Sequence, residues 1–142
     1  MRKHNGFTLI EIMVVVVIIG VLSAIIAPRV MDKIDVARIE SAKANLRTFE
    51  LALRFYRVDN FAYPTTEMGL VALVEKPMRS DAPNWKAGGY LDDNRIPLDP
   101  WGQEYQYMSP GLDGSDYEIT SYGADRRPGG EGVDADLSTV DL

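Results

Sequence analysis

The sequence predicts an α+β protein in which one long helix, from about residue 7 to residue 58, packs on a small head with an antiparallel β-sheet. Three observations support this prediction. Positions 7–27 form an almost uncharged apolar run, an apolar stripe of helical period follows it, and two segments of alternating polarity stand near the C-terminus. We expect three parts: a leader over 1–6, a hydrophobic helix over 7–28, and a head over 29–142 that includes the amphipathic second half of the helix.

The apolar run is long enough to cross a membrane. The sixteen residues from Ile12 to Ala27 carry no charge, and Glu11 is the only ionisable residue between positions 7 and 27. About 20 such residues span a hydrocarbon core of ~30 Å. Two basic residues, Arg2 and Lys3, precede the run and an acidic domain follows it, which predicts a cytoplasmic N-terminus and a head outside the membrane.

Three interpretations of the run differ in how they treat Glu11. A secretory signal peptide would be cleaved after Ala27, where the following proline makes a poor site. A single-span anchor leaves Glu11 unexplained, because a carboxylate at a helix centre costs up to about 2.5–3.5 kcal/mol. Cleavage between Gly6 and Phe7 would instead create an ammonium group that Glu11 of a neighbouring copy neutralises. Breaking a buried pair of this kind typically costs ~3–5 kcal/mol, so the pair would set the register of a staggered assembly.

The predicted helix continues beyond the apolar run. Apolar residues alternate at spacings of three and four, which predicts a stripe that packs on the head: Ile39, Ala42, Leu46, Phe49, Leu53 and Tyr56. Asp59 and Asn60 are expected to end the helix. Gly20 and Pro28 interrupt it, so we expect a kink or local melting between them, with this segment extending when the subunit enters a fibre.

The head begins with a short helix and an ordered loop. Thr65 or Thr66 is expected to cap a helix that runs through Val74. Residues 77–100 are rich in Pro, Gly, Asp and Asn, and we expect three apolar side chains to hold this loop on the core: Trp85, Tyr90 and Ile96.

Two strands are predicted after this loop, over 104–109 and 116–122, joined by a hairpin connection at residues 110–114. The tetrapeptide Asp99-Pro-Trp-Gly102 is interpreted as a tight turn that presents Trp101 to the core. The glycine-rich and aspartate-rich tail from Gly123 is not expected to fold by hydrophobic burial alone.

Composition argues against several classes of function. The net charge is −6, and residues 32–142 hold 12 basic and 20 acidic side chains, whereas nucleic-acid binding needs a basic face. The chain has no cysteine, and its one histidine, His4, lies in the predicted leader, so the usual nucleophile–base pairs are missing and we expect no enzyme. Without disulfides, the small head is expected to be stabilised by some other cross-link, which we call its staple.

The N-terminal motif identifies a superfamily. The segment GFTLIE followed by an apolar run resembles the type IV pilins and the related pseudopilins, whose leader a prepilin peptidase removes before it N-methylates the new phenylalanine. On this resemblance the cleavage lies between Gly6 and Phe7, and Glu11 is the assembly residue. Pilin-like folds pack a long N-terminal helix on a small antiparallel sheet, as predicted above.

Motifs in the head indicate one family within this superfamily. YPTTEMGL (63–70), GGYL (88–91) and LDPWGQEYQY (98–107) are similar to the major pseudopilin family of type II secretion systems. This implies a structural subunit that polymerises from the inner membrane of a Gram-negative bacterium into a periplasmic fibre, which drives export of folded proteins across the outer membrane. The implied partners are further copies of the chain, minor pseudopilins, the prepilin peptidase, an inner-membrane assembly platform, and membrane lipid before assembly.

The same resemblance implies a Ca²⁺ site in the C-terminal loop. The last thirty residues hold eight acids and two arginines, a pattern that alone also fits a solvated acidic loop. By resemblance, the side chains of Asp125 and Asp136 are ligands, the backbone carbonyls of Tyr122 and Arg127 complete part of the shell, and Asp134 is a further candidate carboxylate. One residue departs from the family pattern: Arg126 stands where relatives usually have glycine, and a positive φ there would be strained.

Other functions remain open at this point. A type IV pilin or a DNA-uptake pseudopilin would share residues 6–11. A single-span anchored binding domain would keep its leader and stay monomeric.

Overall fold

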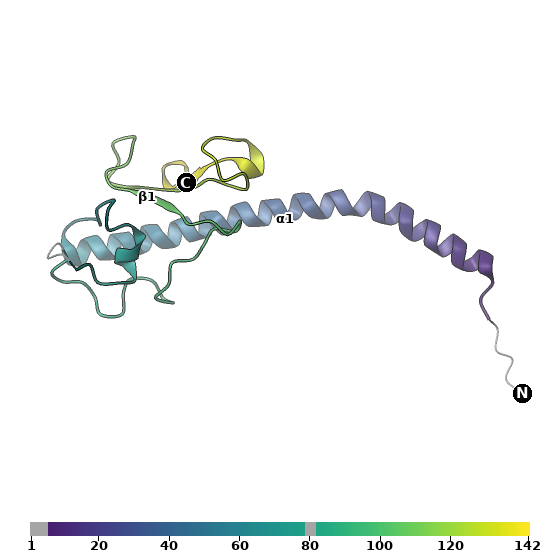
Figure 1. Cartoon of the computed structure of the whole chain (residues 1–142), viewed down its shortest axis with the longest axis horizontal. Coiled ribbons are helices and arrows are strands. Elements are labelled where there is room, and N and C mark those ends of the chain that lie inside the picture. The colour runs from purple at the N-terminus through teal and green to yellow at the C-terminus, as the bar shows by residue number, and fades with distance from the viewer. Residues whose placement is uncertain (1–5, 79–81) are drawn as a thin grey trace, which may run out of the picture. The chain divides into compact units, whose positions relative to one another are not determined.

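The structure, a computed structural model, describes residues 6–78 and 82–142 of the chain. Residues 1–5, which make up most of the predicted leader, lie outside the described part. The chain divides into two compact units, Met1–Val36 and Ala37–Leu142. The elements follow in the order α1 (Leu9–Asn60), η1 (Leu70–Leu73), β1 (Gln106–Met108), β2 (Glu118–Ser121), η2 (Gly132–Asp134), β3 (Leu137–Ser138) and η3 (Thr139–Asp141), where η marks a short 3₁₀ helix (Figure 1). The predicted α+β class is confirmed.

Helix α1 is continuous through the positions where an interruption was expected. Its 52 residues include Gly20 and Pro28, and the backbone is helical throughout. Local melting is therefore absent from this stretch of the isolated subunit. Proline cannot donate a backbone hydrogen bond, so the turn before Pro28 lacks one bond of the helical ladder. The expected extension of this segment in a fibre stays a prediction.

In the first unit, every described large apolar side chain from Phe7 to Val36 is exposed, with exposed fractions between 40% and 79%. An 18-residue window of α1 has a mean hydropathy of 3.0, and none of it is buried. The segment thus has the length and composition of a membrane span, and its own chain does not cover it.

The C-terminal end of α1 has an unusual cap. The side-chain amide of Asn60 donates to the carbonyl of Tyr56, which extends the helix two residues beyond the predicted end at 58. Phe61 follows with φ +65° and donates its backbone N–H to the carbonyl of Arg57 at 2.7 Å. Glycine usually fills this left-handed position. For an L-residue with a side chain the left-handed conformation costs roughly 1–2 kcal/mol.

In the second unit, the predicted stripe of α1 forms one side of the core. Ala42, Leu46, Phe49, Leu53 and Tyr56 are buried as expected, whereas Ile39, the first residue of the predicted stripe, is only half-buried. The Phe49 ring packs edge-on against Tyr105, with centroids 5.1 Å apart. The same core includes residues from η1, β1 and β2: Leu70, Leu73, Tyr107 and Ile119.

The segment between α1 and the sheet is held by polar and aromatic contacts. The Thr65 side chain accepts the backbone N–H of Met68, so the predicted cap forms, although the structure continues as a turn and the short helix η1. The predicted anchors Trp85, Tyr90 and Ile96 all pack on the core. Trp85 also donates its indole N–H to the carbonyl of Ala72 at 2.8 Å.

The sheet is antiparallel and small, with strand order β1-β2-β3. Tyr107 lies opposite Ile119, and Ser121 lies opposite Leu137. Strands β1 and β2 fall within the predicted segments but are shorter. Strand β3 was not predicted, because two residues in a polar tail show no alternation; backbone pairing with β2 forms it.

The Asp99–Gly102 turn buries its aspartate rather than its tryptophan. Asp99 is 4% exposed, whereas Trp101 is half-buried and does not belong to the core cluster, so the expected placement of Trp101 in the core is corrected. One Asp99 carboxylate oxygen accepts the backbone N–H groups of Trp101 and Gln103, and the other accepts the Ser121 hydroxyl at 2.6 Å. These three hydrogen bonds tie the turn to the end of β2.

Replacing Asp99 by alanine should therefore destabilise the head by about 3 kcal/mol, because two backbone N–H groups and the buried Ser121 hydroxyl lose their acceptor. Chemical denaturation of the full chain in detergent measures the effect. Asp113→Ala is the matched control, since Asp113 accepts a backbone N–H in an exposed turn, and it should change stability little. Equal losses in the two variants would show that the buried network is not what stabilises the head.

Candidate functional site

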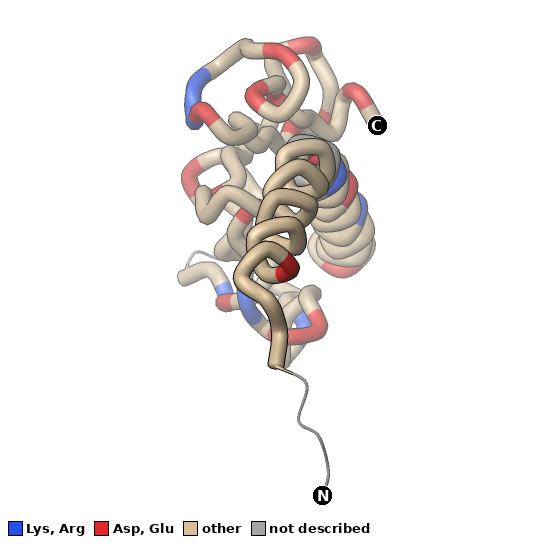
Figure 2. Tube along the Cα trace, turned by 90° about the vertical axis from the view of Figure 1, so that its right-hand side faces the viewer, with Lys and Arg blue, Asp and Glu red and all other residues tan. Residues whose placement is uncertain are grey.

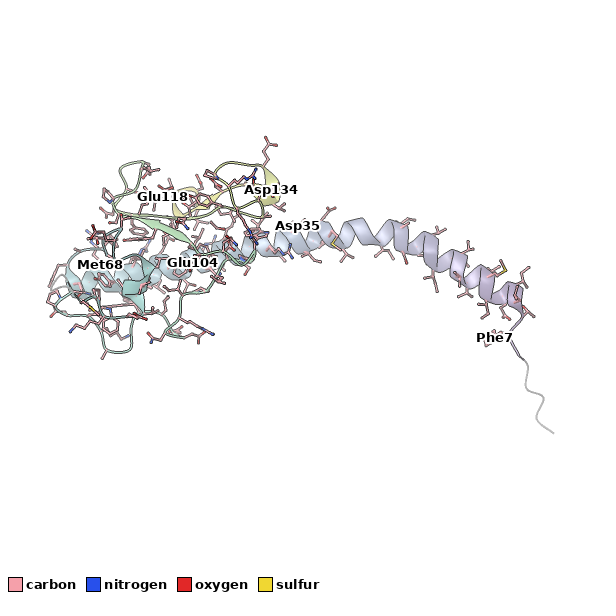
Figure 3. All side chains as sticks on the ribbon, in the orientation of Figure 1. Phe7, Asp35, Met68, Glu104, Glu118 and Asp134 are labelled. Atoms are coloured by element: carbon pink, nitrogen blue, oxygen red, sulfur yellow. The ribbon has the colours of Figure 1, made fainter. Side chains whose placement is uncertain are left out.

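The predicted processing site lies in an accessible segment. Gly6 and Phe7 precede α1 and are exposed, and Phe7 is 79% exposed. Figure 3 shows Phe7 at the start of the helix. An enzyme that cleaves between these residues therefore does not need to unwind regular structure.

Glu11 occupies the first turn of α1 and forms a capping box with Thr8. The backbone N–H of Glu11 donates to the Thr8 hydroxyl at 3.3 Å, and the backbone N–H of Thr8 donates to the Glu11 carboxylate at 3.4 Å. Each side chain thus satisfies a backbone donor that the helix leaves unpaired. Thr8 was not among the predicted functional residues, although a threonine three residues before a glutamate, in front of an apolar run, is a recognised capping signal.

The capping box gives Glu11 a local role, but it does not neutralise the carboxylate. Between Phe7 and Ala27 Glu11 is the only charged side chain, and the helix around it is exposed and apolar (Figure 2). If that helix becomes buried, the charge needs a cation. Glu11 is thus the acid of the apolar run that the amine of a neighbouring chain could pair with.

The second candidate site is the loop between β2 and β3. Continuing the register of these strands by one residue places Tyr122 opposite Asp136 at the mouth of the loop. Farther out, the backbone N–H of Ala124 donates to the carbonyl of Val133 at 2.9 Å, so the two sides of the loop remain close. Figure 3 shows Asp134 on this loop. A Cβ at Gly123 would lie 2.8 Å from the carbonyl oxygen of Val133, so a side chain at this position would clash.

On the first side of the loop, Asp125 is exposed, and its carboxylate accepts the backbone N–H of Arg127 at 3.0 Å. Arg126 adopts φ +64°, in the left-handed region. The strain that the sequence analysis anticipated at this arginine is therefore present, and the left-handed residue lets the chain turn within three residues.

On the other side, one oxygen of Asp136 lacks a protein partner. The Oδ2 atom accepts the backbone N–H of Gly129 at 2.9 Å, whereas Oδ1 is buried and has no hydrogen-bond partner in the described part of the chain. An unpaired buried carboxylate oxygen is costly, so it fits a site that is completed by a ligand. The described residues do not bring three acidic side chains together as a metal cluster, so Asp125, Asp134 and Asp136 are not gathered at one point.

Comparisons with known proteins cover almost the whole chain. Residues 29–140 match the family model described as Type II secretion system (T2SS), protein G, and residues 1–27 match the Prokaryotic N-terminal methylation motif. The chain is 48% identical to the type II secretion system core protein G of Pseudomonas aeruginosa, over 99% of this chain and 97% of that protein. It is 45% identical to the core protein G of Vibrio cholerae, over 100% of this chain and 95% of that protein.

A solved structure supports the same conclusion. The crystal structure of the major pseudopilin from the type 2 secretion system of enterohaemorrhagic Escherichia coli matches with a TM-score of 0.66 and 41% identity, over 79% of this chain and 94% of that chain. The resemblance inferred from residues 6–11 and from the head motifs is confirmed. The chain belongs to the type II secretion system protein G family, the family of the major pseudopilin.

Proposed function

We propose that this chain is the major structural subunit of a type II secretion pseudopilus, a homopolymer that extends from the inner membrane into the periplasm and drives export of folded proteins across the outer membrane. The observation that carries the proposal is the exposed, nearly uncharged first half of α1, which its own chain leaves uncovered. In the proposed cycle, lipid covers this helix first and copies of the same helix cover it afterwards.

Before assembly, the helix crosses the inner membrane once. The basic residues Arg2 and Lys3 remain in the cytoplasm, and the acidic head lies in the periplasm. A prepilin peptidase then cleaves between Gly6 and Phe7 and methylates the new amine. The exposure of this segment and its position ahead of the helix support that assignment.

In the fibre, the Phe7 ammonium of one copy pairs with the Glu11 carboxylate of a neighbour. Both groups enter a surrounding of low dielectric, where either charge alone would be costly, so the pair favours one stagger between helices. The capping box with Thr8 holds the carboxylate at the first turn before it meets its partner. Minor pseudopilins and an inner-membrane platform are the proposed partners during growth, and the segment from Gly20 to Pro28 is the part of the helix that we expect to extend.

Calcium is the proposed staple of the head. Asp125 and Asp136 would hold the ion through their carboxylates, Tyr122 and Arg127 would contribute backbone carbonyls, and Asp134 remains a candidate third carboxylate. The unpaired Oδ1 atom of Asp136 supports this proposal. The bound cation would neutralise carboxylates that otherwise repel each other, and it would fix the loop between β2 and β3 in a head that has no disulfides.

Processing is tested by the intact mass of the chain purified from cells with a type II secretion system. The expected mass is that of a chain beginning at N-methylated Phe7. Gly6→Val should leave the chain uncleaved, because a β-branched side chain replaces a glycine beside the scissile bond, whereas Thr8→Ser should be processed normally. A wild-type chain that retains Met1 in assembled fibres would contradict the proposal.

The charge of Glu11 can be separated from its capping role by comparing two variants. Glu11→Gln keeps an acceptor for the Thr8 N–H but removes the charge, whereas Glu11→Ala removes both. If pairing with Phe7 governs assembly, both variants should lose most of their fibres in electron micrographs of sheared cells. Normal fibre formation by Glu11→Gln, together with loss in Glu11→Ala, would assign the residue to capping alone.

The calcium site is tested by thermal unfolding of the detergent-solubilised chain with Ca²⁺ and with a chelator. Ca²⁺ at a hundredfold excess over its dissociation constant should add about 2.7 kcal/mol to the free energy of unfolding and raise Tm. Asp136→Asn and Asp125→Asn should abolish the Ca²⁺-dependent increase, and Asp113→Asn, in a separate exposed turn, should retain it. An unchanged Tm on chelation in the wild type would rule out calcium as a staple.

A further inference from the structure

The outer face of α1 in the second unit carries an apolar surface that the core does not use. Leu51, Phe55 and Val58 follow one another at spacings of four and three, with exposed fractions of 55%, 55% and 73%, and Phe61 follows at 82%. We call these four residues the knob face. Large exposed apolar surfaces on soluble domains mark interaction sites.

Phe61 is unusual both in conformation and in exposure. It adopts φ +65°, which is a genuine outlier for a bulky residue, at a helix end where glycine would be unstrained. Its ring gains little burial from its own chain to offset that strain. A strained residue that projects an aromatic ring into solvent is the kind of outlier from which a binding role is reasonably inferred.

A matching concave surface exists elsewhere in the head. A groove of about 320 Å³ is lined by Leu70, Val71, Ile96, Leu98, Tyr105 and Tyr107. Leu70 and the two tyrosines are buried, while Val71 and Leu98 are 48% and 53% exposed. Burial raises the pKa of the Tyr105 hydroxyl to about 12, so this side chain stays neutral well above neutral pH.

The rims of the two surfaces carry opposite charges. Arg54 lines the depression that Val58 and Phe61 border, and Glu104, labelled in Figure 3, lines the groove. Arg57 lines the same depression, but Asp116 already pairs with it at 3.2 Å, so Arg54 supplies the positive charge. Neither Arg54 nor Glu104 forms an ion pair within the described residues. Opposite charges around two apolar surfaces favour one docking orientation and disfavour others.

We infer that the knob face of one copy docks in the groove of the next copy along the fibre, with Phe61 as its central residue. No residue lines both surfaces, so the contact joins different patches on the two partners. A contact of this heterologous kind need not close into a dimer, and its repetition builds an open helical polymer. The inference rests on the proposed function, since it assigns a contact between heads within the proposed fibre.

Cysteine pairing tests the contact directly, because the chain has no cysteine of its own. Phe61→Cys is combined with Leu98→Cys or with Val71→Cys, on two different parts of the groove lining, and sheared fibres are oxidised. At least one pair should give a ladder of disulfide-linked oligomers. The control pair of Leu112→Cys with Leu98→Cys places the first cysteine at a position that is 83% exposed and outside the knob face, and it should give no ladder. Fibres that form with no ladder from either groove pair would overturn the inference.

A second variant separates docking from folding. Phe61→Gly removes the strain at φ +65° and should raise the Tm of the head, yet it removes the docking ring and should raise the critical concentration for polymerisation by about tenfold or more. Unchanged polymerisation by a well-folded Phe61→Gly chain would also overturn the inference.

The charge pairing is tested by reversal. Glu104→Arg should weaken polymerisation, and adding Arg54→Glu should restore it; a double variant no better than the single variant would remove this pair from the contact. Wild-type protein that forms no fibres at all would instead contradict the proposed function, so the two failures are distinguishable.

Discussion

The constraint on which the molecule depends is an apolar helical surface that its own chain does not cover. From Phe7 to Val36 the large apolar side chains are exposed, whereas from Ala42 to Tyr56 the same helix buries a stripe in the head. Apolar surface of that extent is unfavourable in water, so lipid or other protein must cover it. Insertion of the precursor into a membrane and packing in a polymer both remove this apolar surface from water. A leader that can be removed allows the protein to change from one to the other.

The periodicity of apolar residues was sufficient to predict the buried face of the long helix and the first two strands. The spacing of Leu46, Phe49, Leu53 and Tyr56 predicted which face of α1 is buried, and the alternation over 104–109 and 116–122 predicted two antiparallel strands. Strand β3 escaped prediction because Leu137 and Ser138 become a strand only through pairing with β2. The role of Asp99 escaped for a similar reason: its hydroxyl partner, Ser121, is 22 residues away along the chain. The most prominent residue of its motif, Trp101, was wrongly expected in the core.

Of the two candidate sites, the one at Glu11 could be recognised from the sequence, whereas the arrangement of the tail loop could not. Glu11 could be recognised from sequence because a charge inside an apolar run is costly, but its capping partner Thr8 was overlooked although the signal is local. In the tail loop, the sequence supplied acids and glycines without their arrangement. The strand register brings Tyr122 and Asp136 to the mouth of the loop, and burial leaves one oxygen of Asp136 unpaired. Neither feature can be read from composition, since both arise from contacts between segments that are distant in the chain.

A density map of assembled fibres, at a resolution that separates side chains, would show directly what covers the apolar helix. We expect residues 7–27 of neighbouring copies to fill the fibre interior, with the Phe7 amine of one copy within ion-pair distance of the Glu11 carboxylate of another. A fibre whose interior excludes these helices, or in which the Glu11 carboxylate faces solvent with no amine beside it, would show that neither the apolar helix nor its single acid organises the polymer.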